Sequence, residues 1–432
     1  MALKEKLLTF ELALSKLANV VSEYQNIFDV CMVDFITKDV FEKAIPPDLQ
    51  ISLQQLSDDE ISLLPNRFFS PENTDLIKLG ALDEIINKLR KHTLESLNIV
   101  ENTESLLQRL SAFKNGNNIT SLKHFDRFMS DKKMHEVEIM SETISYFCEE
   151  KNVGTLIDLG SGKAYLSQVL SAADLNLRIL AIDSSNENSE GAKKRTERLN
   201  SKWDALKKRA DYRSRGQEPP IRSKHSRSKK KVEDFDTDVK TNKFENNLKH
   251  VTKFVDINTD LKLLLKENFN ECDQSDAILD KNRHALIGLH TCGNLAPNSI
   301  KLWLNNSSMK FLCNVGCCYH HLDEEFFKSP YLKEDEISNS SPTFPLSSKL
   351  KSSRYKLGRN ARMIASQPMD RLRTSKELPH ISLLWRAILQ HILLIHVPDL
   401  HFGDHQVIFI NKLLLPKWGN IFRDSGVNSS KF

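Results

Sequence analysis

The stretch Leu156-Ile-Asp-Leu-Gly-Ser-Gly-Lys-Ala-Tyr-Leu166 decides the fold of this chain. A short apolar run ends near an acid, passes through two glycines and enters a helix-forming segment, which predicts a strand, a tight loop and a helix. Gly160 and Gly162 let the backbone turn sharply and approach a ligand closely, because a Cβ would stand in the way. The free N–H groups of a helix beginning near Ala164 would face the same space.

The runs on either side of this loop predict a doubly wound, Rossmann-like α/β sheet. A helix over His135–Glu149 leads into the strand, and a helix over Tyr165–Ala173 connects it to a second apolar run at Leu177–Asp183. Strand followed by helix and strand at this spacing is typical of parallel neighbours. Later brief apolar runs predict three more buried strands, at His250–Val255, Ala285–Leu289 and Lys310–Val315.

Three ligand classes compete for the glycine loop. A nucleoside triphosphate loop would need glycine where Ile157 stands and Ser or Thr in place of Ala164, and a dinucleotide loop would need a third glycine in place of Tyr165. A methyl donor needs an acid at the end of each of two strands, and Asp158 and Asp183 supply them. The alternative is a tight turn in an unrelated α/β protein. We predict S-adenosylmethionine as the cofactor, bound by Asp158, Gly160, Ser161, Gly162, Asp183 and Asp256.

Several ordered blocks resemble the methyltransferase-like protein 25 family, which includes the ribosomal RNA adenine dimethylase domain-containing branch. The resemblance implies a class I methyltransferase fold and a methyl donor, without defining the acceptor. Ala164 departs from the glycine usual in the family, and residues 398–432 do not match its usual ending, so the closing antiparallel hairpin is in doubt; His405–Ile410 could give one late strand. The blocks are Asp34–Glu42, Phe128–Val137, Asp158–Ser167, Gly288–Leu295, Val315–His320 and Leu357–Met363.

Cysteines and histidines follow the fourth and fifth predicted strands, at His290-Thr-Cys292 and Cys317-Cys-Tyr-His-His321. They could form a zinc site, although the C-x-x-C spacing of structural zinc sites is missing. They could also be reduced cysteines packed as small apolar residues. We favour a third interpretation without metal, because a tRNA 2′-O-methyltransferase family has a similar pairing and a neutral histidine can accept a proton from the acceptor. The predicted catalytic residues are His290, Asn294, Tyr319 and His320.

Charge and periodicity predict two domains. Residues 1–118 have helical spacing and form a helical N-terminal domain; residues 119–432 form the methyltransferase domain, with a basic insertion at about 191–249 and a Ser/Pro-rich loop at about 329–353. The segment Lys193–Lys231 holds sixteen Lys and Arg against four Asp and Glu, within a chain of net charge +4. It predicts either RNA binding, together with Arg359 and Arg362, or a solvated linker carrying a nuclear-import signal.

The remaining composition limits location and function class. There is no run of eighteen apolar residues and no secretion signal, and seven cysteines fit a reducing compartment, so we expect cytoplasm or nucleus. The predicted function is methyl transfer to a macromolecule, with RNA favoured over protein. The alternative is a scaffold that binds the donor without turnover and contacts a protein partner through its N-terminal helices.

Overall fold

The computed structural model describes residues 2–61, 64, 80–101, 103–116, 129–172, 177–214, 217, 244, 246–269, 283–327, 342–366 and 382–396. Three sequence predictions fall wholly or mostly outside these residues: the late strand at His405–Ile410, the basic stretch after Ser214 and the first part of the Ser/Pro-rich loop. Among the described helices, none is long and apolar enough to cross a membrane.

The chain divides into two compact units. One consists of residues Glu101–Leu322, and the other combines Met1–Val100 with Asp323–Phe432. This grouping differs from the boundary at 118/119 predicted from the sequence, because the C-terminal segment packs with the N-terminal helices rather than with the sheet.

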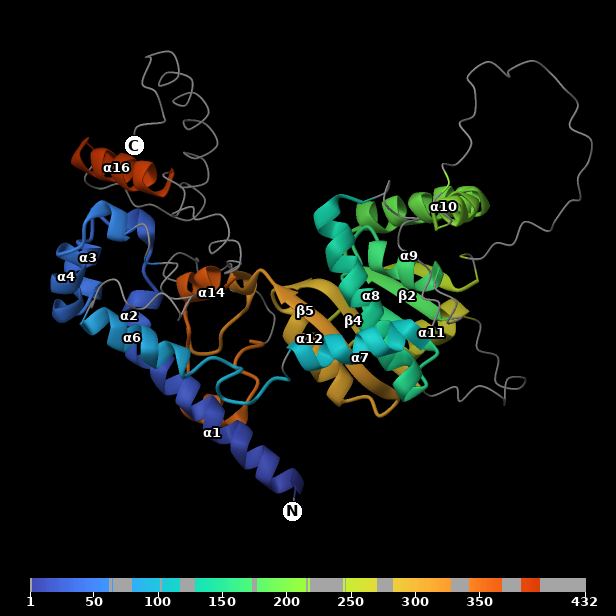
Figure 1. Cartoon of the computed structure of the whole chain (residues 1–432), viewed down its shortest axis with the longest axis horizontal. Helices are drawn as coiled ribbons and strands as arrows, with labels where there is room; N and C mark the ends of the chain where they lie inside the picture. Colours follow the sequence, from blue (N-terminus) through green and yellow to red (C-terminus); the bar gives the residue numbers. More distant parts are fainter. Residues whose placement is uncertain are drawn as a thin grey trace, which may run out of the picture. The chain divides into compact units, whose positions relative to one another are not determined.

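The unit Glu101–Leu322 is built on a parallel five-stranded sheet, which confirms the predicted α/β class (Figure 1). The strand order is β3-β2-β1-β4-β5, so the chain reverses direction across the sheet between β1 and β4. Ligands of such sheets bind beyond the carboxyl ends of the strands at this point of reversal. The strands are β1 Thr155–Leu159, β2 Arg178–Asp183, β3 Leu248–Thr252, β4 His284–Cys292 and β5 Met309–Cys317.

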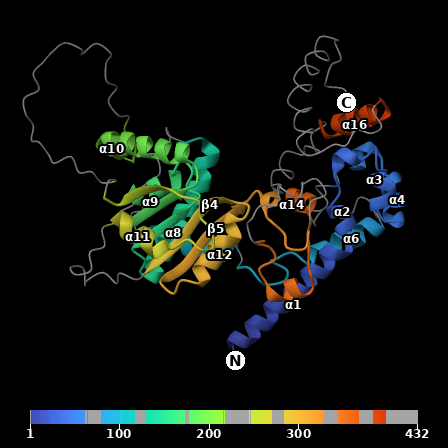
Figure 2. The ribbon, with the colours of Figure 1, turned by 180° about the vertical axis from the view of Figure 1, so that it is seen from behind.

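Helices cover both faces of this sheet, as the two opposite views show (Figures 1 and 2). Alternate residues of β1 point to opposite faces: Leu156 joins the core under α8, α9 and α10, and Ile157 joins the core under α11 and α12. Both side chains are fully buried, as strands covered on both faces require. The helices of this unit are α7 Thr103–Gly116, α8 Asp131–Lys151, α9 Tyr165–Ala172, α10 Asn186–Ser214, α11 Leu261–Phe269, α12 Leu295–Leu304 and the 3-10 turn η4 Tyr319–His321.

The predicted strands are found close to the expected positions, with two informative differences. β3 begins at Leu248 and ends at Thr252, earlier than predicted, and its last bond to β2 is the one that the Lys253 N–H donates to the carbonyl of Asp183. β4 and β5 extend to Cys292 and Cys317, with an irregularity in register between Leu289 and Thr291. The longer strands include His290, Cys292 and Cys317, whereas Cys318, His320 and His321 follow the end of β5.

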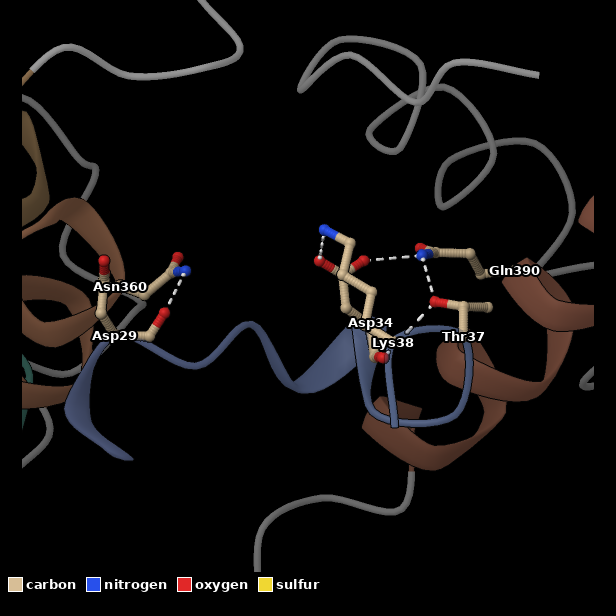
Figure 3. Close-up of polar contacts among 6 residues, drawn as sticks. All are labelled: Asp29, Asp34, Thr37, Lys38, Asn360 and Gln390. Atoms are coloured by element: carbon tan, nitrogen blue, oxygen red, sulfur yellow. Dashed lines mark hydrogen bonds and ion pairs between the residues drawn. The ribbon is translucent and has the colours of Figure 1, made fainter. Parts of the chain in front are cut away.

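The second unit is helical and is assembled from both ends of the chain. Polar contacts join them: Gln390 Nε2 donates to Asp34 Oδ1 at 2.7 Å, and Asn360 Nδ2 donates to the Asp29 carbonyl at 3.0 Å (Figure 3). Its helices are α1 Ala2–Glu23, α2 Gln25–Phe28, η1 Met32–Asp34, α3 Val40–Ala44, α4 Pro47–Gln54, α6 Ala81–Arg90, α13 Ser348–Ser352, α14 Arg359–Ala365 and α16 Ser382–His396.

A buried ion pair organises the start of α14. Arg362 Nε lies 2.7 Å from Glu324 Oε1, and the two side chains are 5% and 0% exposed. The same carboxylate accepts the backbone N–H groups of Leu357 and Gly358. Gly358 has φ +88°, and a Cβ there would lie 2.5 Å from Asp29 Oδ1. The Leu357–Met363 block therefore has a packing role in this helical unit.

Candidate active site

The glycine loop follows β1 and has a backbone that favours glycine. Gly160 has φ +70° and Gly162 has φ +55°, both in the region where a Cβ adds strain. A Cβ on Gly160 would lie 2.9 Å from Leu295 Cδ2, whereas a Cβ on Gly162 would meet no atom within 4 Å. Gly160 is thus constrained by packing against α12, and Gly162 borders open space. Ala164, at φ +55°, takes the same strained conformation without being glycine and is completely buried.

The end of β2 holds this loop in place. The Ile182 carbonyl accepts the N–H groups of Gly160 and Ser161 at 2.9 and 3.0 Å. Asp183 Oδ2 accepts the N–H of Gly162 at 2.8 Å, and its Oδ1 accepts from Ser185 N and Asn188 Nδ2. A carboxylate has about four acceptor positions, so about one remains for a ligand. The two predicted features, glycine loop and second acid, are therefore in direct contact.

Asp158 is a buried acid with one unsatisfied oxygen. Its side chain is at the end of β1, the residue is 1% exposed, and Ser167 Oγ donates to Oδ2 at 2.5 Å. Oδ1 is buried and has no hydrogen-bond partner among the described residues. Burial raises the pKa of this carboxyl to about 7, against the lowering effect of the Ser167 hydrogen bond, and the Asp183 charge raises it further. Asp158 is thus poised between its charged and neutral forms near neutral pH.

Asp256, the third predicted acid, lies just beyond β3 in a polar turn. Its Oδ1 accepts from the backbone N–H of Asn258 and from Thr259 Oγ1, both at 3.0 Å. The residue is half-buried, and these contacts use only one of its two oxygens. The structure therefore places Asp256 beyond the carboxyl end of β3, the strand next to β2.

The four predicted catalytic residues lie around the carboxyl ends of β4 and β5. Asn294 precedes α12, and Tyr319 and His320 form η4 directly after β5. The segments that follow β4 and β5 pack closely: a Cβ added to Gly293 would lie only 2.8 Å from the His321 carbonyl oxygen. The ring of His320 contacts that of His321 in a tilted arrangement, with centroids 4.1 Å apart and an interplanar angle of 43°. The sequence prediction that these residues gather at one edge agrees with this placement; their catalytic roles stay a prediction.

His290 contacts a carboxylate from a helix much earlier in the chain. Its Nε2 lies 3.2 Å from Glu136 Oε2, which comes from α8. His290 also has φ +71°, an uncommon backbone conformation for a residue other than glycine. Its side chain remains 52% exposed. Strained backbone combined with a carboxylate partner is typical of histidines positioned for function.

A set of buried or half-buried polar residues that the sequence analysis did not single out stabilises the carboxyl ends of β4 and β5. The fully buried Thr291 donates its hydroxyl to Asn314 Oδ1, and Asn314 Nδ2 donates to Ser299 Oγ at 2.8 Å. This chain joins β4, β5 and α12. A Cβ on Gly288 would lie 2.9 Å from the carbonyl oxygen of Leu159 on β1 and 2.4 Å from Thr291 Cγ2 of its own strand, so glycine is needed for β4 to pack against β1 with Thr291 in place. Of these residues, Asn314 gave a sequence signal, as a polar residue inside the predicted strand Lys310–Val315, whereas Thr291 lay beyond the predicted strand Ala285–Leu289.

Three thiols gather beside these residues. Cys292 and Cys317 are register partners on β4 and β5, with their sulfurs 3.1 Å apart, and the sulfur of Cys318 lies within 4.8 Å of both. Cys292 is exposed, and the other two are half-buried. Cys313 points elsewhere, into the core under α8, and burial raises the pKa of its thiol to about 11. The interpretation as packed apolar cysteines therefore describes Cys313 better than the other three.

The basic helix α10 has one face on the sheet. Ala192, Leu199 and Trp203 are buried at helical spacing, and Trp203 packs edge-on against Phe244 with ring centroids 5.3 Å apart. Arg195 supports the glycine loop by donating to the Lys163 carbonyl at 3.1 Å. The exposed basic residues of the described part are Lys193, Lys194 and Arg198.

The structure contradicts the predicted role of Arg362. The sequence placed it with Arg359 as a contact for RNA phosphate, but its guanidinium is buried and paired with Glu324. A group with these contacts stabilises the helical unit and is not presented to a phosphate. The RNA prediction therefore depends on Lys193–Lys231 and Arg359.

Comparison with known proteins finds similarity to a methyltransferase domain and to two methyltransferase-like proteins. Residues 132–325 match a protein family described as "Methyltransferase domain". The chain is 28% identical over 455 residues to human "Probable methyltransferase-like protein 25", covering 84% of this chain and 74% of the human protein. It is 28% identical over 443 residues to the mouse protein of the same name, covering 84% and 73%. No solved structure matches.

These matches confirm the resemblance inferred from the sequence blocks: the chain is similar to proteins named probable methyltransferase-like protein 25, and residues 132–325 are similar to a methyltransferase domain. The matched residues fall largely within the sheet-bearing unit Glu101–Leu322. The domain and the named homologues together support methyltransferase activity.

Proposed function

We propose that this chain transfers a methyl group from S-adenosylmethionine to a macromolecule, with RNA ahead of protein. The main support for the proposal is the contact between the glycine loop and β2, in which the Gly162 N–H donates to the Asp183 carboxylate at 2.8 Å. The loop and the acid lie at the point where the strand order reverses, which is where ligands of doubly wound sheets bind.

The residues of the loop fit a donor without phosphates. The open space at the Cβ position of Gly162 allows a ligand to approach the backbone, and the unpartnered Oδ1 of Asp158 offers a buried acceptor. Asp183 and Asp256 would bind hydroxyl or amino groups through the oxygens they have left. S-adenosylmethionine supplies an electrophilic methyl group on a sulfonium, so the protein's task is to orient the acceptor and remove its proton.

His290 and Glu136 are suited to hold that proton. If Glu136 accepts the Nε2–H of His290, Nδ1 is the ring nitrogen left to accept a proton. As the acceptor atom forms its bond to the methyl carbon, its proton would pass to Nδ1. Asn294, Tyr319 and His320 would line the acceptor space from the adjoining strand ends.

The choice of RNA is supported by charge. Lys193, Lys194 and Arg198 project from α10 while the opposite face of this helix packs on the sheet. They begin the segment Lys193–Lys231, whose sixteen basic and four acidic residues favour binding to a phosphate backbone.

The test is Gly162→Ala, measured by calorimetry with S-adenosylmethionine and S-adenosylhomocysteine. A Cβ at Gly162 has room in the protein but would enter the space offered to the donor, so affinity should fall at least about tenfold, or ~1.4 kcal/mol. Gly80→Ala is the matched control, because Gly80 also has a positive φ (+48°) and an uncrowded Cβ position, with the nearest atom 3.9 Å away, and lies in the other unit.

Three outcomes separate the alternatives. Loss of donor affinity in Gly162→Ala alone, with label from tritiated donor appearing in total RNA, supports the proposal. Donor binding with label in neither RNA nor protein favours the scaffold function. Undetectable donor binding by the unmodified chain refutes both.

A further inference from the structure

Three sulfurs from two neighbouring strand ends form a compact group outside the donor loop. Cys292 ends β4 and Cys317 ends β5, and the register of the parallel ladder sets them directly opposite each other. Cys318 follows with φ +50°, a conformation that costs a non-glycine residue energy and turns the chain abruptly. These three thiols are the one group of at least three His, Cys, Asp or Glu ligand atoms found close together among the described residues.

The spacing suits a thiophilic ion. In a tetrahedral zinc–thiolate site, zinc–sulfur bonds of about 2.3 Å place the sulfurs about 3.8 Å apart. The sulfurs of Cys292 and Cys317 are 3.1 Å apart, and all three sulfurs lie within 4.8 Å of one another. Rotation of the side chains by less than about one ångström at the sulfur would reach the zinc geometry.

The surroundings distinguish this group from packed core cysteines. Cys292 is exposed, so an ion can enter from solvent, whereas the neighbouring Cys313 lies in the apolar core. The backbone beneath the group is fixed by the Thr291–Asn314–Ser299 hydrogen bonds and by contact of Gly293 with the His321 backbone. A ligand set on two rigid strand ends loses little entropy on binding an ion.

We propose that Cys292, Cys317 and Cys318 bind one zinc ion through three thiolates, with the fourth coordination position open. Three protein ligands with an open position are the arrangement of catalytic rather than structural zinc sites. Soft sulfur ligands select zinc over calcium or magnesium, which prefer oxygen. The site lies at the same sheet edge as His290, whose carbonyl is 3.4 Å from the Cys292 sulfur. The proposal stands independently of donor binding.

The experiment uses the full chain, purified under a phosphine reductant without chelator. Zinc content is measured by elemental analysis, and the stripped protein is titrated with Co²⁺. One zinc per chain is expected, with a thiolate-to-cobalt charge-transfer band that saturates at one Co²⁺ and disappears when Zn²⁺ is added. Cys292→Ala and Cys318→Ala should abolish the saturable band.

Cys313→Ala is the matched control, because it removes a cysteine from the same strand, β5, but outside the group. It should keep the band, and circular dichroism should show all variants folded. A band that survives in Cys292→Ala would overturn the proposal. So would three freely titrating thiols that bind no cobalt, or a Cys292–Cys317 disulfide found by mass spectrometry in place of the metal.

Discussion

Asp158→Asn should flatten the pH dependence of stability of the sheet-bearing unit. The carboxyl is buried, and its pKa is raised from 3.8 to about 7 in the folded protein. A raised pKa means that the folded state holds the proton more tightly than the unfolded chain does. Its contribution to stability is therefore complete below about pH 4 and is lost as pH rises toward and through 7.

The size of the effect follows from the two pKa values. Between about pH 5 and about pH 8, the shift makes the unfolding free energy fall by about 2 to 3 kcal/mol, since one pKa unit is worth about 1.4 kcal/mol. Asparagine keeps an oxygen to accept the Ser167 hydroxyl but cannot ionise. The variant should lack this decrease, although its buried amide N–H groups should lower stability by about 1 to 3 kcal/mol at every pH.

The assay must report on one unit of a two-unit chain. Hydrogen exchange of peptides from β1 and β4 is followed by mass spectrometry in a urea series at both pH values. The change in unfolding free energy between about pH 5 and about pH 8 is then compared between the unmodified chain and Asp158→Asn. The contributions of all other titrating groups cancel in this comparison. If both proteins lose the same stability from about pH 5 to about pH 8, Asp158 is ionised throughout and the argument from its burial is wrong.

Three further predictions concern other contacts. Glu136→Gln should lower kcat about ten- to a hundredfold, with little change in donor Kd, because His290 loses its carboxylate partner; an unchanged kcat would remove Glu136 from the site. Glu324→Gln should cost about 3 to 5 kcal/mol in the helical unit by leaving Arg362 buried without its counter-charge, as measured by exchange in α14 peptides, while β1 peptides serve as the control. Replacing three exposed basic residues of α10 by glutamine should weaken RNA binding at low salt and reduce the salt dependence by up to about 0.9 per lost phosphate contact; equal binding at every salt concentration would assign that face another role. Those residues are Lys193, Lys194 and Arg198.

The sheet was predictable because its signals are local. The run Leu156-Ile-Asp-Leu-Gly-Ser-Gly predicts a strand, a turn and a backbone that a ligand can approach closely, all within a few residues. Because the strands are buried on both faces, each one is also visible as a short apolar run. The end of β4 was harder to predict, because Thr291 looks like a loop residue until its hydroxyl is seen bonded across to Asn314.

The contacts that were missed join residues far apart in the chain. Glu136 and His290 are separated by 154 positions, and Asp34 and Gln390 by 356. Polar residues at such separations leave no periodicity in the sequence. For the same reason Arg362 resembled a surface cation, since only the fold shows Glu324 beside it.

The assembly of the helical unit from both chain ends affects how the protein is made on the ribosome. Residues 101–322 can emerge and form their sheet before Gln390, the hydrogen-bond partner of Asp34, has been synthesised. At about 5 to 20 residues per second, 356 positions correspond to a delay of about 20 to 70 seconds. During that time the leading helices expose side chains later covered by α16, so a chaperone that shields nascent chains should improve the yield of this unit more than that of the sheet.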